Sequence, residues 1–282
     1  FASSCFGSSC TVSTHQRRSD TAFFSGCFTD RSPALTQSAD CHIGAGWDII
    51  DFIPTYANGF ELMPLPQQQD LELHDNTAAA LQLVGSFPHH LHPQALYIYP
   101  DGSYYPTQDT DLEDAFGMVA LAQDSSSDII GIIGTLYHPI ANAGFGCNDI
   151  DAPSSTTAEL AGLVWSLIWL ISRTDNVEAH IFIDSSTAAG MADKNFMPKV
   201  NFNLSMLAAY LLKITRLKRQ CFIKTIIEHT GAKAHSGDPW NELADALAKH
   251  GAHHNYSWLP PLAKEHVRFS SGLRWAWLSA DS

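Results

Sequence analysis

Four carboxylates lie where the sequence pattern places the ends of secondary-structure elements. They are Asp101, Glu159, Asp184 and Asp245. Neighbouring strands of a sheet lie about 4.7–4.9 Å apart, so Asp101 and Asp184 can meet if the strands that they end are paired. Carboxylates held that close cannot all remain ionised without a cation. Oxygen ligands suit Mg²⁺ or Mn²⁺, and two such ions about 3.5–4 Å apart can clamp a phosphodiester and activate water.

Each of these acids also has a purely structural explanation. The pattern permits a turn at Asp101-Gly102, a capping box from Thr156 to Glu159, a helix cap at Asp184 and a solvent-facing helix position at Asp245. On the last helix, Asp245 lies four residues after Asn241, so the two side chains share a face. From this pattern alone, that face points either at a site or at water.

From residue 95 onward, short apolar runs alternate with longer amphipathic ones. Their spacing predicts strands over 96–99, 117–121, 129–137, 179–183 and 221–227, and helices over 157–172, 185–192, 204–215 and 239–249. This order of elements is typical of a mixed α/β sheet. Pro100 lacks the N–H that a ladder needs, so we expect the first strand to end near it.

Four segments, in order along the chain, together resemble the ribonuclease H family. They are Tyr-Pro-Asp101-Gly-Ser, Thr-Thr-Ala-Glu159-Leu, Ile-Phe-Ile-Asp184-Ser-Ser and His235-Ser-Gly-Asp-Pro-Trp-Asn-Glu-Leu-Ala-Asp245. Any one segment is a weak signal, but four in this order on matching elements are specific. The resemblance covers roughly residues 95–252. This part of the chain is similar in particular to the ribonuclease H domains that follow reverse transcriptases in retroelements.

The resemblance implies an α/β fold, a ribonuclease H-like five-stranded mixed sheet in the order 3-2-1-4-5 flanked by helices. It implies a metal-dependent endonuclease that cuts the RNA strand of RNA–DNA hybrids by two-metal-ion catalysis. In the family, the four acids bind two Mg²⁺ ions, with Mn²⁺ as a substitute, and the histidine at the position of His235 assists turnover. Gly102, Ser103 and Asn241 stand where the family contacts substrate. A reverse transcriptase domain in the same longer chain is the implied partner.

Two other functions remain open. A ribonuclease H-like module can be catalytically silent and serve as a nucleic-acid-binding or spacer domain beside a reverse transcriptase, although the presence of all four acids argues for activity. Another nuclease of the superfamily, such as an integrase or exonuclease, is also conceivable. The final Asp245, in place of a helical glutamate, argues against an integrase.

The chain is acidic overall, with a net charge of −13, which by itself disfavours nucleic-acid binding. The charge is segregated, however, because the stretch between Asp193 and Glu228 contains no acid and seven bases. Such a stretch is usually a solvated face, but its position among the acid-bearing elements suggests contacts to backbone phosphates. We expect Arg216, Lys218 and Arg219 to make these contacts.

We expect three regions: a poorly ordered or accessory segment over 1–94, the ribonuclease H-like domain over 95–255 and a tail over 256–282. Because the sequence starts with Phe1, we interpret it as a piece of a longer protein. No run of about 18 apolar residues indicates a membrane span, so no membrane partner is expected. The cysteines near the start lack zinc-finger spacing, and free thiols suggest a reducing compartment, in the nucleus or cytoplasm.

Overall fold

The structure, a computed structural model, describes residues 22–24, 41–43, 55–88, 92–106, 111–126, 128–145, 150, 152–195, 198–230, 237–253, 255–264 and 267. The chain divides into two units, one formed by Phe1–Phe52 with Trp275–Ser282 and the other by Ile53–Arg274. In the first unit, β1 (Ala22–Phe24) pairs antiparallel with β2 (Cys41–Ile43). All sites considered below belong to the second unit.

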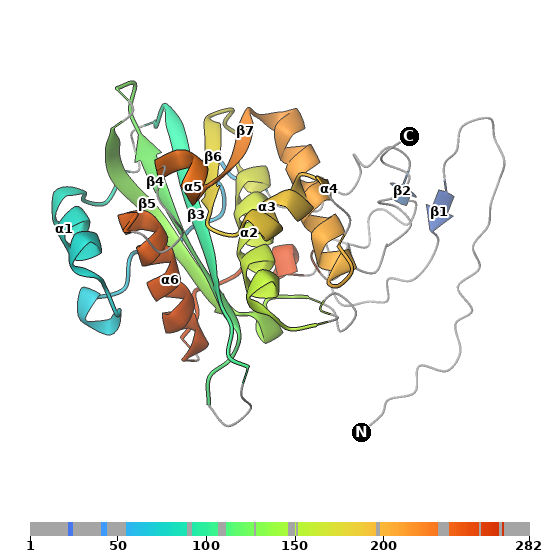
Figure 1. The fold of residues 1–282 in the computed structure, drawn as a ribbon. Helices are drawn as coiled ribbons and strands as arrows, with labels where there is room; N and C mark the ends of the chain where they lie inside the picture. Colours follow the sequence, from blue (N-terminus) through green and yellow to red (C-terminus); the bar gives the residue numbers. More distant parts are fainter. Residues whose placement is uncertain are drawn as a thin grey trace. The chain divides into compact units, whose positions relative to one another are not determined.

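A five-stranded sheet forms the centre of the second unit, in the spatial order β5-β4-β3-β6-β7 (Figure 1). The strands are β3 (Ala95–Ser103), β4 (Ala115–Gln123), β5 (Ile129–Pro139), β6 (Glu178–Ile183) and β7 (Cys221–Thr225). The β3–β4 and β4–β5 pairs are antiparallel, whereas β3–β6 and β6–β7 are parallel. Counted along the chain, the order is 3-2-1-4-5, which confirms the predicted mixed α/β sheet.

The helices that follow β5, β6 and β7 along the chain pack on this sheet or on one another. They are α2 (Ser155–Ser172), α3 (Ser186–Ala192), α4 (Phe202–Lys218), α5 (Ile226–Thr230) and α6 (Pro239–Ala252). Helix α2 packs on β3 and β4 and is covered by α4, while α6 packs on β3, β4 and β5. The two helices that carry Glu159 and Asp245 therefore both reach the two strands at the centre of the sheet.

Helix α2 is apolar around its whole circumference, because the sheet covers one side of it and α4 the other. By length and composition it could cross a membrane, but 83% of it is buried inside the protein. It is the one helix of this kind among the described residues. Trp165 and Trp169 are the largest side chains that it buries. We interpret α2 as the core helix of the fold.

The prediction that the first strand ends near Pro100 is wrong, because β3 continues through Pro100 to Ser103. Pairing of β3 with β6 ends at Ile98, whereas pairing with β4 extends to Ser103. Pro100 thus lies beyond the β6 ladder, so its missing N–H interrupts no rung there. The extra length carries Asp101 within the strand instead of placing it in a turn.

The segment before the sheet packs against the edge strand β5 and against α6. Met63 forms an antiparallel bridge with Thr135, and Ser86 forms a parallel bridge with Ile132. Between these bridges lie a short 3₁₀ helix, η2 (Gln68–Asp70), and helix α1 (Asp75–Leu83), which contacts α6. The two bridges thus occupy part of an edge that would otherwise offer free backbone groups to another strand. The predicted boundary at 94/95 stays a prediction.

Replacing Leu81 with alanine should destabilise the protein by about 2–4 kcal/mol, since Leu81 is buried in the core cluster that α1 shares with α6. Leu83, on the same helix, is 86% exposed and provides the matched control. Leu83→Ala should change stability by about 0.5 kcal/mol or less. Urea unfolding of the whole chain measures both. Equal effects of the two substitutions would show that α1 does not belong to the folded core.

Candidate functional site

Asp101 is at the centre of the site, near the end of β3 and almost fully buried. Its Oδ1 accepts a hydrogen bond of 2.7 Å from the backbone N–H of Gly102. Its Oδ2 is buried and has no hydrogen-bond partner among the described residues. A buried carboxylate oxygen without a donor is costly, so this atom is suited to a ligand that the protein does not itself provide.

Two glycines explain how the helices come close enough to Asp101. A Cβ on Gly102 would lie 2.3 Å from the backbone N of Glu159, and a Cβ on Gly117 would lie 2.4 Å from the carbonyl O of Ala244. Gly117 pairs with Asp101 across the β3–β4 ladder, whereas Gly102 points to the opposite face of the sheet. Thus α2 approaches from one face and α6 from the other, each at the turn that carries an acid.

Glu159 lies one turn into α2 and does not cap the helix. Ser154 is the N-cap, and its hydroxyl accepts a hydrogen bond from the N–H of Thr157. The Asn201 side chain donates to the hydroxyl of Thr157 at 2.8 Å, which ties the start of α2 to the start of α4. The capping box from Thr156 to Glu159 is therefore wrong, because the helix begins two residues earlier than that box requires. This leaves the carboxylate of Glu159 free of a capping role.

Asp184 directly follows β6, and the next residue takes over the capping of α3. The hydroxyl of Ser185 accepts a hydrogen bond of 3.1 Å from the N–H of Ala188. The alternative that Asp184 caps this helix is therefore wrong. Since β6 is parallel to β3 and adjacent to it, Asp184 reaches the same end of the sheet as Asp101.

Asp101, Glu159 and Asp184 each offer a carboxylate oxygen, and these oxygens all lie within 4.8 Å of one another. Burial raises the pKa of Asp101 well above its usual range, and the nearby charges of Asp184 and Asp245 raise it further. Burial, followed by the charge of Asp184, raises the pKa of Glu159 to about 8. Crowded carboxylates that resist ionisation are stabilised by a divalent cation, and an all-oxygen donor set suits a hard cation such as Mg²⁺ or Mn²⁺.

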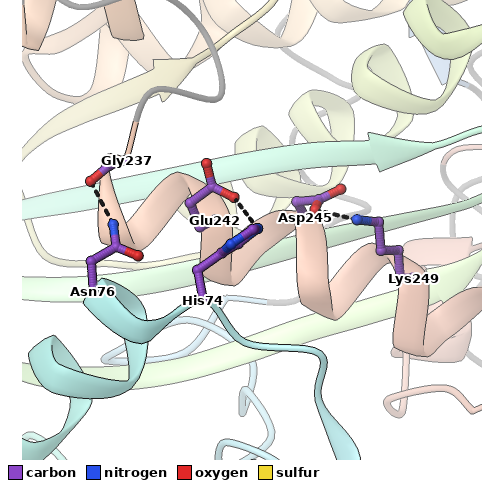
Figure 2. A pocket seen from close by; sticks show the side chains of 6 residues that line it. All are labelled: His74, Asn76, Gly237, Glu242, Asp245 and Lys249. Carbon is purple, nitrogen blue, oxygen red and sulfur yellow. Dashed lines mark hydrogen bonds and ion pairs between the residues drawn. The ribbon is translucent and has the colours of Figure 1, made fainter.

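Asp245 lies near this cluster on α6, the helix that packs closely against Gly117. The N-terminus of α6 is capped by Asp238, which accepts hydrogen bonds from the N–H groups of Trp240 and Asn241. The carboxylate of Asp245 pairs with Lys249, one turn later, at 2.7 Å (Figure 2). Asp245 is therefore beside the group of three acids and electrostatically coupled to Asp101, but its oxygens are not part of the tight cluster.

The predicted substrate residues near the cluster have different surroundings. The structure gives Gly102 a packing role, because any side chain there would collide with α2. Ser103 is buried at the end of β3. Asn241 is almost fully buried, and neither polar atom of its amide has a partner in the described part of the chain. The amide of Asn241, one turn before Asp245, thus remains a candidate for contact with a ligand.

The prediction that Arg219 contacts phosphates is wrong. The Arg219 side chain is fully buried and pairs with Asp175 at 2.9 Å. It also donates to the carbonyls of Arg173, Asp175 and Val177, which closes the chain after α2. A guanidinium fixed in this way cannot reach a nucleic acid.

Arg216 and Lys218 also have partners within the protein. Arg216 pairs with Asp193 at 2.6 Å, and Lys218 donates to the carbonyl of Ile171 at 3.0 Å. Both lie near the C-terminal end of α4, where charge alone predicted a phosphate-binding surface. Their contact with phosphates stays a prediction.

Some predicted residues lie outside the described part of the chain. His235 is one of them, so its proposed role in turnover stays a prediction. The same holds for the cysteines at positions 5, 10 and 27. Among the described residues, Cys221 is a free thiol and is buried.

Five residues for which the sequence indicated no role lie beside Asp245 in one pocket: His74, Asn76, Gly237, Glu242 and Lys249. His74 and Asn76, from the segment before the sheet, meet Glu242 and Gly237 on α6 and the turn that leads into it (Figure 2). Glu242 stands inside the Asn-Glu-Leu-Ala-Asp segment, so the sequence pattern could have identified it. His74 and Asn76 carried no signal, because nothing local connects them to a helix far along the chain.

The chain matches no protein-family model and no curated protein sequence. Solved structures resemble it at low identity. RNase H1 from Halobacterium salinarum NRC-1 is 16% identical, with 57% of this chain and 99% of that chain covered and a TM-score of 0.40. The prototype foamy virus RNase H domain is 17% identical, with 56% and 94% covered and a TM-score of 0.38. Foamy viral protease-reverse transcriptase with an RNA/DNA hybrid is 14% identical, with 60% and 22% covered and a TM-score of 0.40.

The class of fold rests on the sheet of this chain itself. Its strand order, with acids on the first strand, the first long helix, the fourth strand and the last helix, is the arrangement that the sequence resemblance implied. The fold is thus ribonuclease H-like.

Arg219→Ala should lower the free energy of unfolding by about 3 kcal/mol, because it leaves a set of buried acceptors without a donor. Lys224, which is exposed on β7, serves as the matched control, and Lys224→Ala should be nearly neutral. Chemical denaturation compares the two variants. An Arg219 variant as stable as the Lys224 variant would contradict the structural role.

The metal-free protein should be less stable at pH 8.5 than at pH 5, and Glu159→Gln should weaken this dependence. The pKa of Glu159 rises from 4.5 to about 8 on folding, so the folded state holds its proton more tightly than the unfolded state. The resulting stability is fully present below pH 4.5 and is lost as the pH rises through about 8. Urea unfolding in EDTA at both pH values measures it, with the exposed Glu61→Gln as control. An unchanged pH dependence in the Glu159 variant would argue against a raised pKa.

Proposed function

We propose that the chain is a divalent-metal-dependent endonuclease that hydrolyses the RNA strand of RNA–DNA hybrids. The observation that carries this proposal is the buried cluster of Asp101, Glu159 and Asp184, whose oxygens lie within 4.8 Å of one another. The substrate class comes from the resemblance of the four acid-bearing segments to ribonuclease H. The convergence of Asp101, Glu159 and Asp184 at one end of the sheet supports this assignment.

The residues present fit divalent cations, since Oδ2 of Asp101 and Oε2 of Glu159 are buried and have no hydrogen-bond partner among the described residues. Asp101, Glu159, Asp184 and Asp245 would hold two Mg²⁺ ions, with Mn²⁺ as a substitute. Bound at this place, such ions would stabilise the charge that develops on a phosphodiester and lower the pKa of water. Within the described part of the chain, no cysteine or histidine belongs to the tight cluster, which favours these hard cations over zinc.

The protein's own groups would orient and surround the reacting phosphate. Asp101 lies within β3 and accepts a hydrogen bond from the N–H of Gly102. It therefore offers a carboxylate oxygen at a fixed position. Asn241 would direct its amide toward the nucleic acid. His235 would move a proton during turnover, since a neutral imidazole can do so near pH 7. A reverse transcriptase domain in a longer chain is the partner that we propose.

Cleavage of a labelled RNA–DNA hybrid in Mg²⁺ is the direct test, with duplex RNA and duplex DNA as comparison substrates. We expect the RNA strand of the hybrid to be cut, and the activity to stop in EDTA. Cleavage that survives EDTA, or equal cutting of duplex DNA, would contradict the proposal. Binding of hybrid without any cleavage would instead favour the silent nucleic-acid-binding module.

Asp101→Asn should abolish cleavage and, without metal, leave the protein as stable as the parent or more stable. The amide removes one ionisable group from a buried acidic cluster, so it avoids the cost of a carboxylate charge there while it deletes a metal ligand. The exposed Asp111→Asn is the matched control and should retain activity. Single-turnover cleavage and unfolding in EDTA measure the two effects. An Asp101 variant with near-parental rates would exclude this residue as a ligand.

A further inference from the structure

A polar pocket opens directly beside Asp245 and has a volume of about 300 Å³. Three of its lining residues, Glu242, Asp245 and Lys249, come from α6 and one, Gly237, from the turn before it. The other two, His74 and Asn76, come from the start of α1, in the segment before the sheet (Figure 2). This segment is no part of the resemblance to ribonuclease H, so its side chains add something that the resemblance does not predict.

His74 occupies the N-cap position of α1 but makes no capping hydrogen bond. Serine, threonine, aspartate and asparagine are the residues that stabilise this position. The imidazole instead reaches across to α6, where its Nε2 lies 3.2 Å from a carboxylate oxygen of Glu242. The residue type at this position therefore serves the contact with α6 and the pocket, not the helix that it begins.

The wall that carries His74 is firmly anchored. Leu71 and Leu81, on either side of it, belong to the same core cluster as Leu243 and Leu247 of α6. Asn76 donates a hydrogen bond of 2.8 Å to the carbonyl of Gly237 (Figure 2). His74 is thus held at a defined place relative to Asp245 before any ligand arrives.

The exposed side chains of the pocket are basic, and its carboxylates lie behind them. The side chains of His74 and Lys249 are 66% and 43% exposed, whereas those of Glu242 and Asp245 are 7% and 17% exposed. Each acid is paired with one of the two basic side chains (Figure 2). In a chain with a net charge of −13, an incoming anion here meets two hydrogen-bond donors instead of bare carboxylates.

We propose that His74 is a substrate-binding residue, which together with Lys249 holds a phosphodiester group of the nucleic-acid strand that passes the acidic cluster. This inference rests on the proposed function, and it adds a subsite that the segment before the sheet contributes. This phosphodiester lies in the pocket beside Asp245 and is not the one that is cleaved. The contact therefore positions the strand and takes no part in the chemistry.

Binding of hybrid by variants made in the cleavage-deficient Asp101→Asn protein tests the contact directly. His74→Ala should weaken binding about tenfold, the effect expected for one hydrogen bond to a charged phosphate. His74→Lys keeps an N–H donor at this position and should restore most of the affinity. The plot of log affinity against log salt should be shallower for the alanine variant than for the lysine variant, by about 0.7–0.9. The exposed His92→Ala is the matched control and should bind like its parent.

Cleavage by the corresponding variants of the active protein separates binding from chemistry. His74→Ala should raise KM about tenfold and change kcat by less than about twofold. The reason is that the contact stabilises the bound substrate and the transition state equally. If His74 serves only to hold Glu242, the alanine variant loses stability in urea while affinity and KM stay parental, and the proposal is overturned. An alanine variant that fails to fold leaves the decision to His74→Gln, which must bind more weakly than His74→Lys.

The proposed function and this inference fail in different ways. A parent protein that binds duplex DNA as tightly as hybrid, and cuts neither, contradicts the proposed function, yet the His74 series can still be measured on the duplex. A parent that binds and cuts hybrid, with a His74→Ala variant of equal affinity, salt dependence and KM, overturns the subsite alone. A parent that binds no nucleic acid contradicts both.

Discussion

Two close backbone contacts, at Gly102 and Gly117, determine where the acids of this protein lie. At each contact a Cβ would fall less than 2.5 Å from the backbone of a helix, at 2.3 Å from Glu159 and at 2.4 Å from Ala244. The strand and the helix can approach so closely only because both positions lack a side chain. Since Glu159 and Asp245 lie on those same helical turns, the packing of helix on sheet and the gathering of carboxylates are one structural feature.

This arrangement costs stability, because it buries acids beside one another, and the rest of the unit has to hold it in place. The raised pKa values of Asp101 and Glu159 both begin with burial. Helix α2 is held at its start by Ser154 and Asn201, and after its end by Arg219, which closes the chain around Asp175. A bound cation would offset the repulsion, so the same residues that strain the metal-free fold provide the reason for metal binding.

The segment before the sheet links the stability of the fold to the site. It covers the β5 edge through its bridges to Ile132 and Thr135, and it contributes Leu71 and Leu81 to the core cluster of α6. The same segment brings His74 to the pocket beside Asp245. One stretch of chain thus protects an edge strand, supports the helix of the fourth acid and lines the pocket next to it.

The sequence by itself indicated most strands and helices from residue 95 onward, the sheet order through the resemblance, and the four acids as candidates. It was wrong after β7, where the predicted strand 221–227 ends at Thr225 and Ile226–Thr230 forms α5. Tertiary structure decided what depends on burial and on distant segments. Arg219 has the charge of a phosphate ligand but is buried against Asp175, and charge patterns carry no information about burial. Gly102 proved to be a packing contact, Ser154 rather than Thr156 caps α2, and His74 meets Glu242. Local spacing cannot show which distant backbone a glycine admits or which helix a histidine reaches, because only the folded chain brings them together.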